Sequence, residues 1–309
     1  MSRSAVAILT NERDFAADVV VRRLHAFGVE VHRINYEAAR TSEVQPWGPS
    51  TSNRDDEPNP SVVWWRQFET DESPSTLQDV DDLLVERAQW RAWVATLASS
   101  SGTWMNDLWA ARRAENKVEQ LRVAGSVGFD VPLTLVTNDR SRAIEFEQAV
   151  GSAVVKTLAS AYFSFSDKSF VFTGHLDRAA ALPVDAWHAA PVVIQQLIEG
   201  GLDARVVSVA CRCFAGRCRS RGLDWRKTPF DSELWAPWDP PERIVHACES
   251  YRARLGLEFA AFDFMITSGT IFFLEANQAG EWLFLDRALD LGIGHAIADR
   301  LVSLGSIRD

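Results

Sequence analysis

Three oxygen-bearing side chains near the C-terminus could together hold a divalent cation. Two apolar runs joined by Ser268-Gly269 predict a β-hairpin. Asp263 lies on its first strand, while Glu275 and Asn277 are two residues apart on the second strand and therefore share a face. Carboxylate and amide oxygens suit Mg²⁺, which completes its shell with water and substrate phosphates. The alternative is that these are ordinary polar residues at strand ends, but a carboxylate among so many apolar neighbours is costly without a partner.

Two lysines upstream could neutralise the phosphates that such a cation would bind. Lys156 ends an apolar strand, where a compact positive charge suits polyphosphate oxygens. The loop that follows, 157–168, is rich in serine and small residues and could cover phosphates with hydroxyl and backbone donors. Lys117 lies within a predicted helix, and on its own it is more simply a solvated surface charge.

A predicted strand at 191–196 leads into a glycine pair that is typical of a hinge between subdomains. Its backbone could bind the edge of an adenine ring while apolar side chains cover the face of the ring. On the next strand Asp203 and Arg205 share a face, and the arginine could clamp a phosphoryl group with two parallel hydrogen bonds. A surface ion pair is the alternative for these two residues. The candidate nucleotide-binding residues of this segment are Gln196, Leu197, Ile198, Glu199 and Asp203.

The N-terminal part of the chain has the pattern of an open α/β layer. An apolar run at 5–9 predicts a strand, helical spacing of apolar residues predicts a helix over 14–27, and a second strand follows at 29–34. This order is typical of a βαβ unit. A third strand is expected at 61–66, and the polar stretch 41–60 before it lacks periodicity and predicts a surface insertion.

The rest of the chain is expected to continue with two helices, over 75–97 and 108–127, and then to become rich in strands. Cys211 and Cys213 alternate along one of these strands, and Ala215-Gly216 lies near the predicted hairpin turn. Together with Cys218 they match no common zinc spacing, which favours buried thiols.

Composition limits the possible partners. The chain has 309 residues and a formal charge of −10, from 32 Lys and Arg against 42 Asp and Glu. Long-range repulsion of phosphate therefore argues against nucleic acid as a partner. No apolar run approaches the ~20 residues needed to cross a bilayer, and no signal peptide is recognised. We expect a cytoplasmic protein without a membrane partner.

The order and spacing of these elements resemble the ATP-grasp superfamily, in which two α+β subdomains hold ATP between them. More closely, the chain resembles the graspetide synthetases, the microviridin-type peptide macrocyclases, over nearly its whole length except 41–60. The resemblance rests on the ordered segments Arg13–Asp18, His32–Asn35, Val63–Arg66, Asn116-Lys117, Gly128–Pro132, Asp203–Arg205, Asp224–Arg226 and Glu275–Asn277.

This resemblance implies a fold of class α/β (α+β) with three parts. They are an N-terminal βαβ pre-ATP-grasp domain over 1–115, a small central lid domain over 116–190, and a C-terminal antiparallel-sheet domain over 191–309. Family members convert Asp or Glu side chains of a ribosomal precursor peptide, made of leader and core, into acyl phosphates. A Ser or Thr hydroxyl or a Lys amine of the same peptide then closes an ω-ester or ω-amide ring. A homodimer is also implied.

The resemblance further implies roles for single residues. Lys117 and Lys156 would hold the ATP phosphates, and the hinge at 196–198 would cradle adenine. Two Mg²⁺ ions would be held by Asp263, Glu275 and Asn277. Arg205 and Arg226 would lie over the phosphoryl group and the substrate carboxylate, and Asp224 is our candidate to accept a proton from an attacking hydroxyl. The candidate substrate contacts are Arg66, Trp225 and Trp282, of which Trp282 would serve equally well as a core residue.

Two departures from the family pattern concern loops. The loop 157–168 has Ser, Tyr and Phe where many ATP-grasp proteins have glycines, and Asn277 is followed by Gln278–Trp282 without the proline that is common in the family.

Three other functions compete with peptide macrocyclisation. One is an ATP-grasp ligase that acts on a small amino acid or a protein terminus, and another is a non-catalytic partner that binds a leader peptide. A dinucleotide-binding oxidoreductase is disfavoured because the turn Thr10–Arg13 lacks the glycines that let backbone approach a pyrophosphate.

Overall fold

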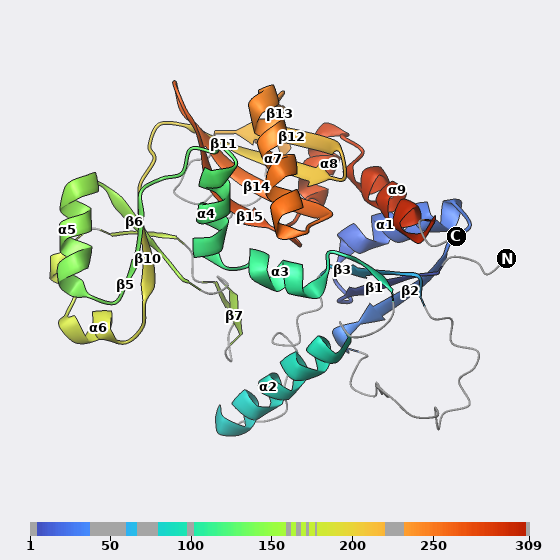
Figure 1. Ribbon diagram of the computed structural model, residues 1–309, viewed down its shortest axis with the longest axis horizontal. Coiled ribbons are helices and arrows are strands. Elements are labelled where there is room, and N and C mark those ends of the chain that lie inside the picture. The colour runs from blue at the N-terminus through green and yellow to red at the C-terminus, as the bar shows by residue number, and fades with distance from the viewer. Residues whose placement is uncertain are drawn as a thin grey trace.

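The computed structural model describes residues 5–37, 60–66, 80–97, 102–158, 162–164, 168–170, 173–176, 178–219 and 232–306. Within these residues the chain forms a parallel sheet, two larger antiparallel sheets and a two-stranded hairpin. Figure 1 shows the parallel sheet on the right, the C-terminal antiparallel sheet above the centre and the central antiparallel sheet on the left. No helix among the described residues is long and apolar enough to cross a membrane.

The N-terminal sheet is parallel, with the strand order β2-β1-β3-β4. Asp14 starts the first helix by accepting hydrogen bonds from the backbone N–H groups of Ala16 and Ala17. The predicted βαβ opening is confirmed, and residues 41–59 of the predicted insertion lie outside the described residues. The elements are β1 (Ala5–Thr10), α1 (Phe15–Ala26), β2 (Glu30–Asn35), β3 (Val62–Trp65), α2 (Val80–Leu97) and β4 (Thr103–Met105).

The helix predicted over 108–127 is two helices, α3 (Leu108–Ala114) and α4 (Lys117–Ser126). Asn116 separates them because its side chain accepts hydrogen bonds from the N–H groups of Val118 and Glu119 and so caps a new helix. Lys117 is therefore the first residue of α4. Helix α4 packs against β15 of the C-terminal sheet, although its residues were expected to belong to the central subdomain.

The central sheet is antiparallel, with the order β5-β10-β6-β9. Its strand β10 pairs with β5 and β6, so the predicted boundary between 190 and 191 is wrong and the chain passes to the C-terminal sheet only after Gln196. The elements are β5 (Thr134–Thr137), α5 (Arg140–Val150), β6 (Ala153–Lys156), β9 (Gly174–His175), a 3-10 helix (Ala179–Ala181), α6 (Val184–His188) and β10 (Val192–Gln196), and the separate hairpin is β7 (Tyr162–Ser164) with β8 (Lys168–Phe170).

The C-terminal sheet is also antiparallel, with the order β13-β12-β11-β14-β15. Strand β15 lies at its edge. The elements are β11 (Leu202–Val209), β12 (Arg212–Cys218), a 3-10 helix (Ser232–Leu234), β13 (Trp235–Pro237), α7 (Glu242–Leu255), β14 (Phe259–Ile266), β15 (Ile271–Asn277), α8 (Leu283–Leu289) and α9 (Ile293–Ser306).

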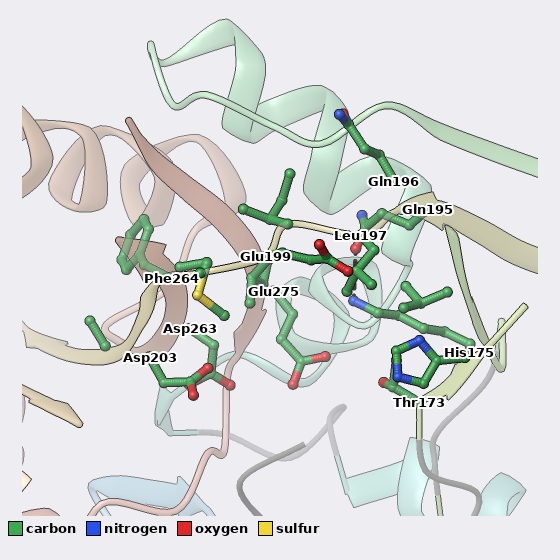
Figure 2. A pocket seen from close by; sticks show the side chains of 18 of the residues that line it. Thr173, His175, Gln195, Gln196, Leu197, Glu199, Asp203, Asp263, Phe264 and Glu275 are labelled. Atoms are coloured by element: carbon green, nitrogen blue, oxygen red, sulfur yellow. Dashed lines mark hydrogen bonds between the residues drawn. The ribbon is translucent and has the colours of Figure 1, made fainter. Parts of the chain in front are cut away.

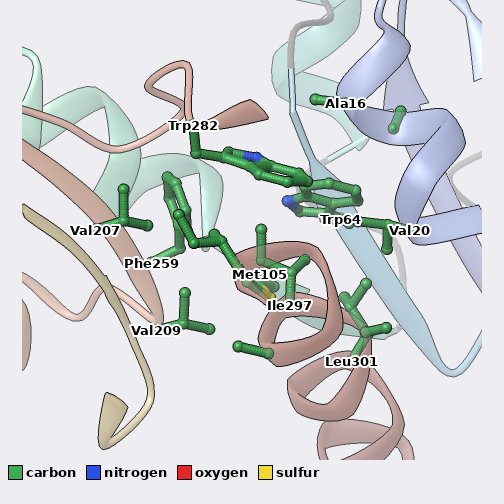
Figure 3. Close-up of a cluster of buried hydrophobic side chains, with 14 of the residues drawn as sticks. Ala16, Val20, Trp64, Met105, Val207, Val209, Phe259, Trp282, Ile297 and Leu301 are labelled. Atoms are coloured by element: carbon green, nitrogen blue, oxygen red, sulfur yellow. The ribbon is translucent and has the colours of Figure 1, made fainter. Parts of the chain in front are cut away.

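One hydrophobic core joins the N-terminal and C-terminal parts. Helix α9 packs against α1, β1, β3 and β4, so the last helix of the chain packs on the N-terminal sheet (Figure 1). Trp282 points into this core together with Trp64 (Figure 3) and has no exposed surface. A Cβ on Gly294 would lie 3.1 Å from the indole ring of Trp282, so glycine lets the ring pack closely on α9. The prediction that Trp282 contacts substrate is therefore wrong, because the ring is enclosed by protein.

A cluster of aromatic rings supports the β14–β15 hairpin. Phe129 lies with its ring centroid 5.5 Å from that of Phe273 and 5.3 Å from that of Phe264. The backbone carbonyl of Asp130 accepts a hydrogen bond of 2.8 Å from the N–H of Phe273. This buried packing holds one face of the hairpin, so the side chains on its other face have fixed positions.

Candidate functional site

A cavity of about 480 Å³ lies between the central and C-terminal sheets (Figure 2). This volume is within the range of small-molecule binding sites. Strands β6, β9 and β10 contribute to one wall, while β11, β14 and β15 contribute to the other. The cavity is lined by eight of the residues predicted to bind nucleotide or metal: Lys156, Gln196, Leu197, Ile198, Glu199, Asp203, Asp263 and Glu275.

A β-bulge turns Glu275 toward this cavity. Strict alternation along β15 would place Glu275 on the same face as Phe273, which is fully buried in the core. The register, however, pairs Phe264 with Phe273 and Asp263 with Glu275, so Leu274 is an extra residue. Glu275 consequently leaves the core face and lies opposite Asp263. Asn277 shares the new face, and its Nδ2 donates a hydrogen bond of 3.3 Å to Glu275 Oε1.

The arrangement suits a hard cation that keeps ligands from outside the protein. Asp263 and Glu275 face each other across two paired strands, and Asn277 contributes an amide oxygen to the same face. Among the described residues no group of three or more His, Cys, Asp and Glu side chains is placed to hold a metal. Mg²⁺ at this cluster would therefore complete its coordination with water or phosphate oxygens, which is its usual behaviour.

Arg205 lies beside the acidic pair and is buried. Its Nη1 donates a hydrogen bond of 2.7 Å to Asp263 Oδ1, and the two residues are direct partners on β11 and β14. A buried charge-assisted bond of this kind fixes the orientation of a carboxylate. In this conformation Arg205 therefore orients Asp263 and does not extend over the cavity.

Gly280 leaves the space that Arg205 occupies. A Cβ at this position would lie 2.8 Å from Arg205 Nη2 and 2.7 Å from the Cβ of Ala261. We expect Gly280→Ala to lower the free energy of unfolding by about 1–3 kcal/mol, because overpacking forces the neighbours to move. We also expect weaker cation binding, since displacement of Arg205 would turn Asp263.

Chemical denaturation and a Mn²⁺ titration would measure these two effects. Gly269→Ala is the matched control, because a Cβ there would have no heavy atom within 4 Å. If Gly280→Ala behaved like this control in both measurements, the close fit around Arg205 would have no role.

Both predicted lysines lie near the acidic cluster. Lys156 Nζ donates a hydrogen bond of 2.8 Å to Gln195 Oε1, drawn as a dashed line in Figure 2. Lys117 Nζ donates a hydrogen bond of 2.5 Å to the backbone carbonyl of Thr157. A second, narrow cavity of about 20 Å³ is lined by both lysines and by Glu275. Lys156 and Glu275 line both cavities, so a positive and a negative group meet where a metal-phosphate complex could bind.

Superposition on solved structures identifies the fold. Macrocyclase MdnC of Microcystis aeruginosa, bound with precursor peptide MdnA, superposes with a TM-score of 0.82 at 23% identity over 97% of this chain and 99% of that one. Macrocyclase MdnB of the same organism gives 0.76 at 27% identity over 97% and 99%. The ATP-grasp ligase PsnB, complexed with a minimal precursor, Mg and ADP, gives 0.73 at 19% identity over 99% of both chains.

The chain has the ATP-grasp fold. The predicted fold class is therefore confirmed. No protein-family model matches the sequence, and no curated protein matches it either. The fold is thus recognised through the arrangement of its elements over nearly the whole chain.

Backbone contacts and close packing hold segment 196–201, which joins the two sheets of this ATP-grasp fold. Leu197 N–H donates to the carbonyl of Ser152 over 2.9 Å, which ties the end of β10 to the start of β6. Gly201 permits the chain to turn into β11, because a Cβ there would lie 2.5 Å from Met265 Sδ and 2.6 Å from the carbonyl oxygen of Ile266. The backbone of 196–201 consequently lines the cavity closely, where a flat ring could bind between the two sheets of the ATP-grasp fold.

Several residues that line the ATP-grasp cavity were not predicted. His175 belongs to the short strand β9, which pairs with β6, and Thr173 directly precedes β9 (both are labelled in Figure 2). Arg219 follows β12, and Leu274 is the bulged residue of β15. The two-residue strand β9 is too short to produce a periodic pattern, so neither Thr173 nor His175 could be identified from the sequence.

Arg66 is buried between the N-terminal sheet and the loop after β15, which corrects its predicted contact with substrate. Its guanidinium donates to the carbonyl oxygen of Ala279 and, over 2.8 Å, to Glu281 Oε1. Its Nε lies 3.6 Å from Asp14 Oδ2. Only 1% of Arg66 is exposed, so it ties the N-terminal sheet to the loop that follows Asn277.

The remaining predicted site residues, Asp224, Trp225 and Arg226, lie outside the described residues. The cysteine nearest to the site is Cys218, the direct partner of Asp203 in the sheet. Burial, together with the negative charges of Asp203 and Asp263, raises the pKa of Cys218 to about 12. Its thiol therefore stays protonated at neutral pH and is a poor nucleophile.

Proposed function

We propose that this chain is an ATP-dependent ligase that forms ester or amide crosslinks within a ribosomal precursor peptide. One observation carries the proposal: a single cavity brings Lys156, the hinge at 196–201 and the acidic pair Asp263 and Glu275 together between two sheets. The macrocyclases MdnC and MdnB match the chain from the N-terminal sheet to α9, and not over the nucleotide site alone. These superpositions support a peptide substrate, which is the kind of molecule bound to MdnC.

In this proposal ATP occupies the cavity with its adenine at the hinge. The backbone of Gln196–Ile198 binds the edge of the ring, and Leu197 and Ile198 cover its faces. Glu199, in the hinge, and Asp203, on β11, also line the cavity, where they accept hydrogen bonds from the ribose hydroxyls or from phosphate-bound water. Lys156 and Lys117 bind the phosphates as positive charges on one side.

Asp263, Glu275 and Asn277 would hold Mg²⁺, two ions by the family resemblance. Bound there, the cations would neutralise charge on the phosphate oxygens. Arg205 orients Asp263 for this purpose through their hydrogen bond of 2.7 Å. The protein thus supplies mainly positioning and electrostatic stabilisation.

The reaction proceeds in two displacements. An oxygen of a substrate Asp or Glu carboxylate attacks the γ-phosphorus of ATP, the bond from that phosphorus to the bridging oxygen breaks, and ADP leaves. A hydroxyl or amine of the same peptide then attacks the acyl carbon, the bond to the phosphate oxygen breaks, and phosphate leaves. The nucleophile's proton goes to a base, for which Asp224 is the candidate, while Arg226 binds the carboxylate and Trp225 contacts the peptide.

Mass spectrometry of a candidate precursor tests this function directly. The purified protein is incubated with ATP, Mg²⁺ and the short peptide encoded beside its gene. We expect the peptide to lose one water for each ring closed and ADP to form in equal number. ADP formation without any loss of peptide mass would contradict crosslinking.

The homodimer and the cytoplasmic location remain predictions. Size-exclusion chromatography with light scattering would check the first, and cell fractionation would check the second.

A further inference from the structure

Gln120 of helix α4 makes three hydrogen bonds with its side-chain amide although it is buried. Its Oε1 accepts from the backbone N–H of Ala276 over 3.1 Å, and its Nε2 donates to the carbonyl of Ala276 over 2.9 Å. The same Nε2 donates to the carbonyl of Ala114, the last residue of α3, over 2.7 Å. These partners fix which end of the amide is oxygen, because only a donor can serve the two carbonyls.

This amide takes the place of a neighbouring strand. Strand β15 is the edge of its sheet, and the N–H and C=O of Ala276 point away from β14. Left without partners in a buried position, both groups would be costly. Gln120 satisfies both of them, so the edge strand is held at the residue between Glu275 and Asn277. The positions of the candidate metal ligands Glu275 and Asn277 therefore depend on the hydrogen bonds between Gln120 and Ala276.

The same helix also carries a predicted phosphate ligand. Lys117 and Gln120 are three residues apart, which places them on one face of α4. Both line the narrow second cavity together with Glu275. The start of α4 is fixed by the side chain of Asn116, which caps it. One amide thus connects the element that bears Lys117 with the strand that bears Glu275 and Asn277.

We propose that Gln120 is a positioning residue, which sets the distance between the phosphate-binding lysine and the metal ligands of β15. The inference rests on the proposed function, in which these groups bind a metal-nucleotide complex. Outer contacts of this kind commonly change metal affinity by about 10- to 100-fold when they are removed. The effect should therefore appear in cation binding in the presence of nucleotide, and not only in stability.

Two substitutions separate this role from simple packing. Gln120→Glu keeps the shape, but a carboxylate oxygen would face the carbonyls of Ala114 and Ala276 where a donor is needed. Gln120→Met keeps the length and removes all three hydrogen bonds. Ser208→Ala is the matched control, because it removes a buried hydroxyl that accepts a hydrogen bond of 2.8 Å from Arg252 Nε, away from the cavity.

Mn²⁺ binding in the presence of AMPPNP, followed by electron paramagnetic resonance, is the readout, with Tm measured in parallel. We expect both Gln120 variants to raise the Kd for Mn²⁺ by about tenfold or more. Affinity for AMPPNP without a divalent cation should stay near that of the unmodified protein. Ser208→Ala should lower Tm while it leaves Mn²⁺ binding unchanged.

The inference is overturned if the Gln120 variants bind Mn²⁺ as tightly as the unmodified protein, or if Ser208→Ala weakens Mn²⁺ binding as much as they do. The protein could also bind Mn²⁺ and AMPPNP and lose Mn²⁺ affinity when Gln120 is replaced, yet crosslink no peptide. That result would contradict the proposed function and support the role of Gln120. The two failures are therefore distinguishable.

Discussion

Replacing Glu275 with Gln is expected to reduce ATP-dependent crosslinking by about a thousandfold or more, and Asp263→Asn should have a similar effect. A thousandfold loss corresponds to about 4 kcal/mol of the activation barrier, which is within the several kcal/mol that a bound cation supplies. Both substitutions keep the size of the side chain but remove a negative charge from the cation site. For Asp263→Asn the partner Arg205 also loses its buried counter-charge, so a fall in stability should accompany the loss of activity.

Initial rates of ADP formation and of peptide dehydration would measure this loss at saturating ATP and Mg²⁺. Asp299→Asn is the control, because it makes the same chemical change in an exposed carboxylate that pairs with Arg212. Surface pairs contribute little, so this variant should keep its activity. Full activity of Glu275→Gln with normal Mg²⁺ dependence would contradict the metal assignment.

Replacing Lys156 with Met is expected to reduce kcat/KM for ATP by about a hundredfold. A hydrogen bond to a charged group contributes about 1.5–3 kcal/mol, and 2.7 kcal/mol corresponds to a hundredfold. Methionine keeps the unbranched chain at the end of β6 and loses the charge. The hydrogen bond to Gln195 Oε1 is lost too, but both of these side chains lie at the cavity, so we expect only a modest fall in Tm.

Steady-state kinetics with varied ATP would give this ratio, and calorimetric titration with ADP would give the affinity directly. Arg142→Met removes an exposed positive charge from α5 beside the same central sheet, and it should bind and use ATP normally. If Lys156→Met and Arg142→Met had equal kcat/KM for ATP and equal affinity for ADP, phosphate binding by Lys156 would be excluded.

The hairpin that carries the acidic cluster could be predicted because its signals are local. Two apolar runs around Ser268-Gly269 gave the strands, and Asp263 does lie opposite Glu275. The bulge at Leu274 could not be predicted. Nothing in the sequence shows that Phe273 faces the core while Glu275 faces the cavity, since alternation alone puts both on one face.

The hairpin turn was predicted at the wrong place because Gly216 is required by close packing and not by a turn. The hairpin expected near Gly216 instead turns at Ala210-Cys211, where Ala210 has a φ of 49°. Gly216 lies inside β12, and a Cβ there would approach Leu285 and Leu289 to within 2.7 Å. These leucines belong to α8, about 70 residues further along the chain. No short-range sequence pattern could therefore reveal their contact with Gly216.

Long-range pairing also decided which sheet β10 joins. Its apolar residues predicted a strand, but the sequence of a buried strand does not show which strands pair with it. In the structure β10 pairs with β5 and β6. Arg66 was a comparable case. The resemblance made it a candidate substrate contact, whereas its ion-pair partners Asp14 and Glu281 lie near opposite ends of the chain.

In the proposed function, Asp263, Glu275 and Asn277 hold cations beside a nucleotide whose phosphates reach Lys156. A crystal grown with Mn²⁺ and AMPPNP, with anomalous data collected at the manganese edge, would show both the cations and the nucleotide. We expect an anomalous peak between the Asp263 and Glu275 carboxylates, within coordination distance of the nucleotide phosphates. Nucleotide bound elsewhere, or a cavity that holds nucleotide while the three side chains have no manganese peak among them, would contradict this expectation.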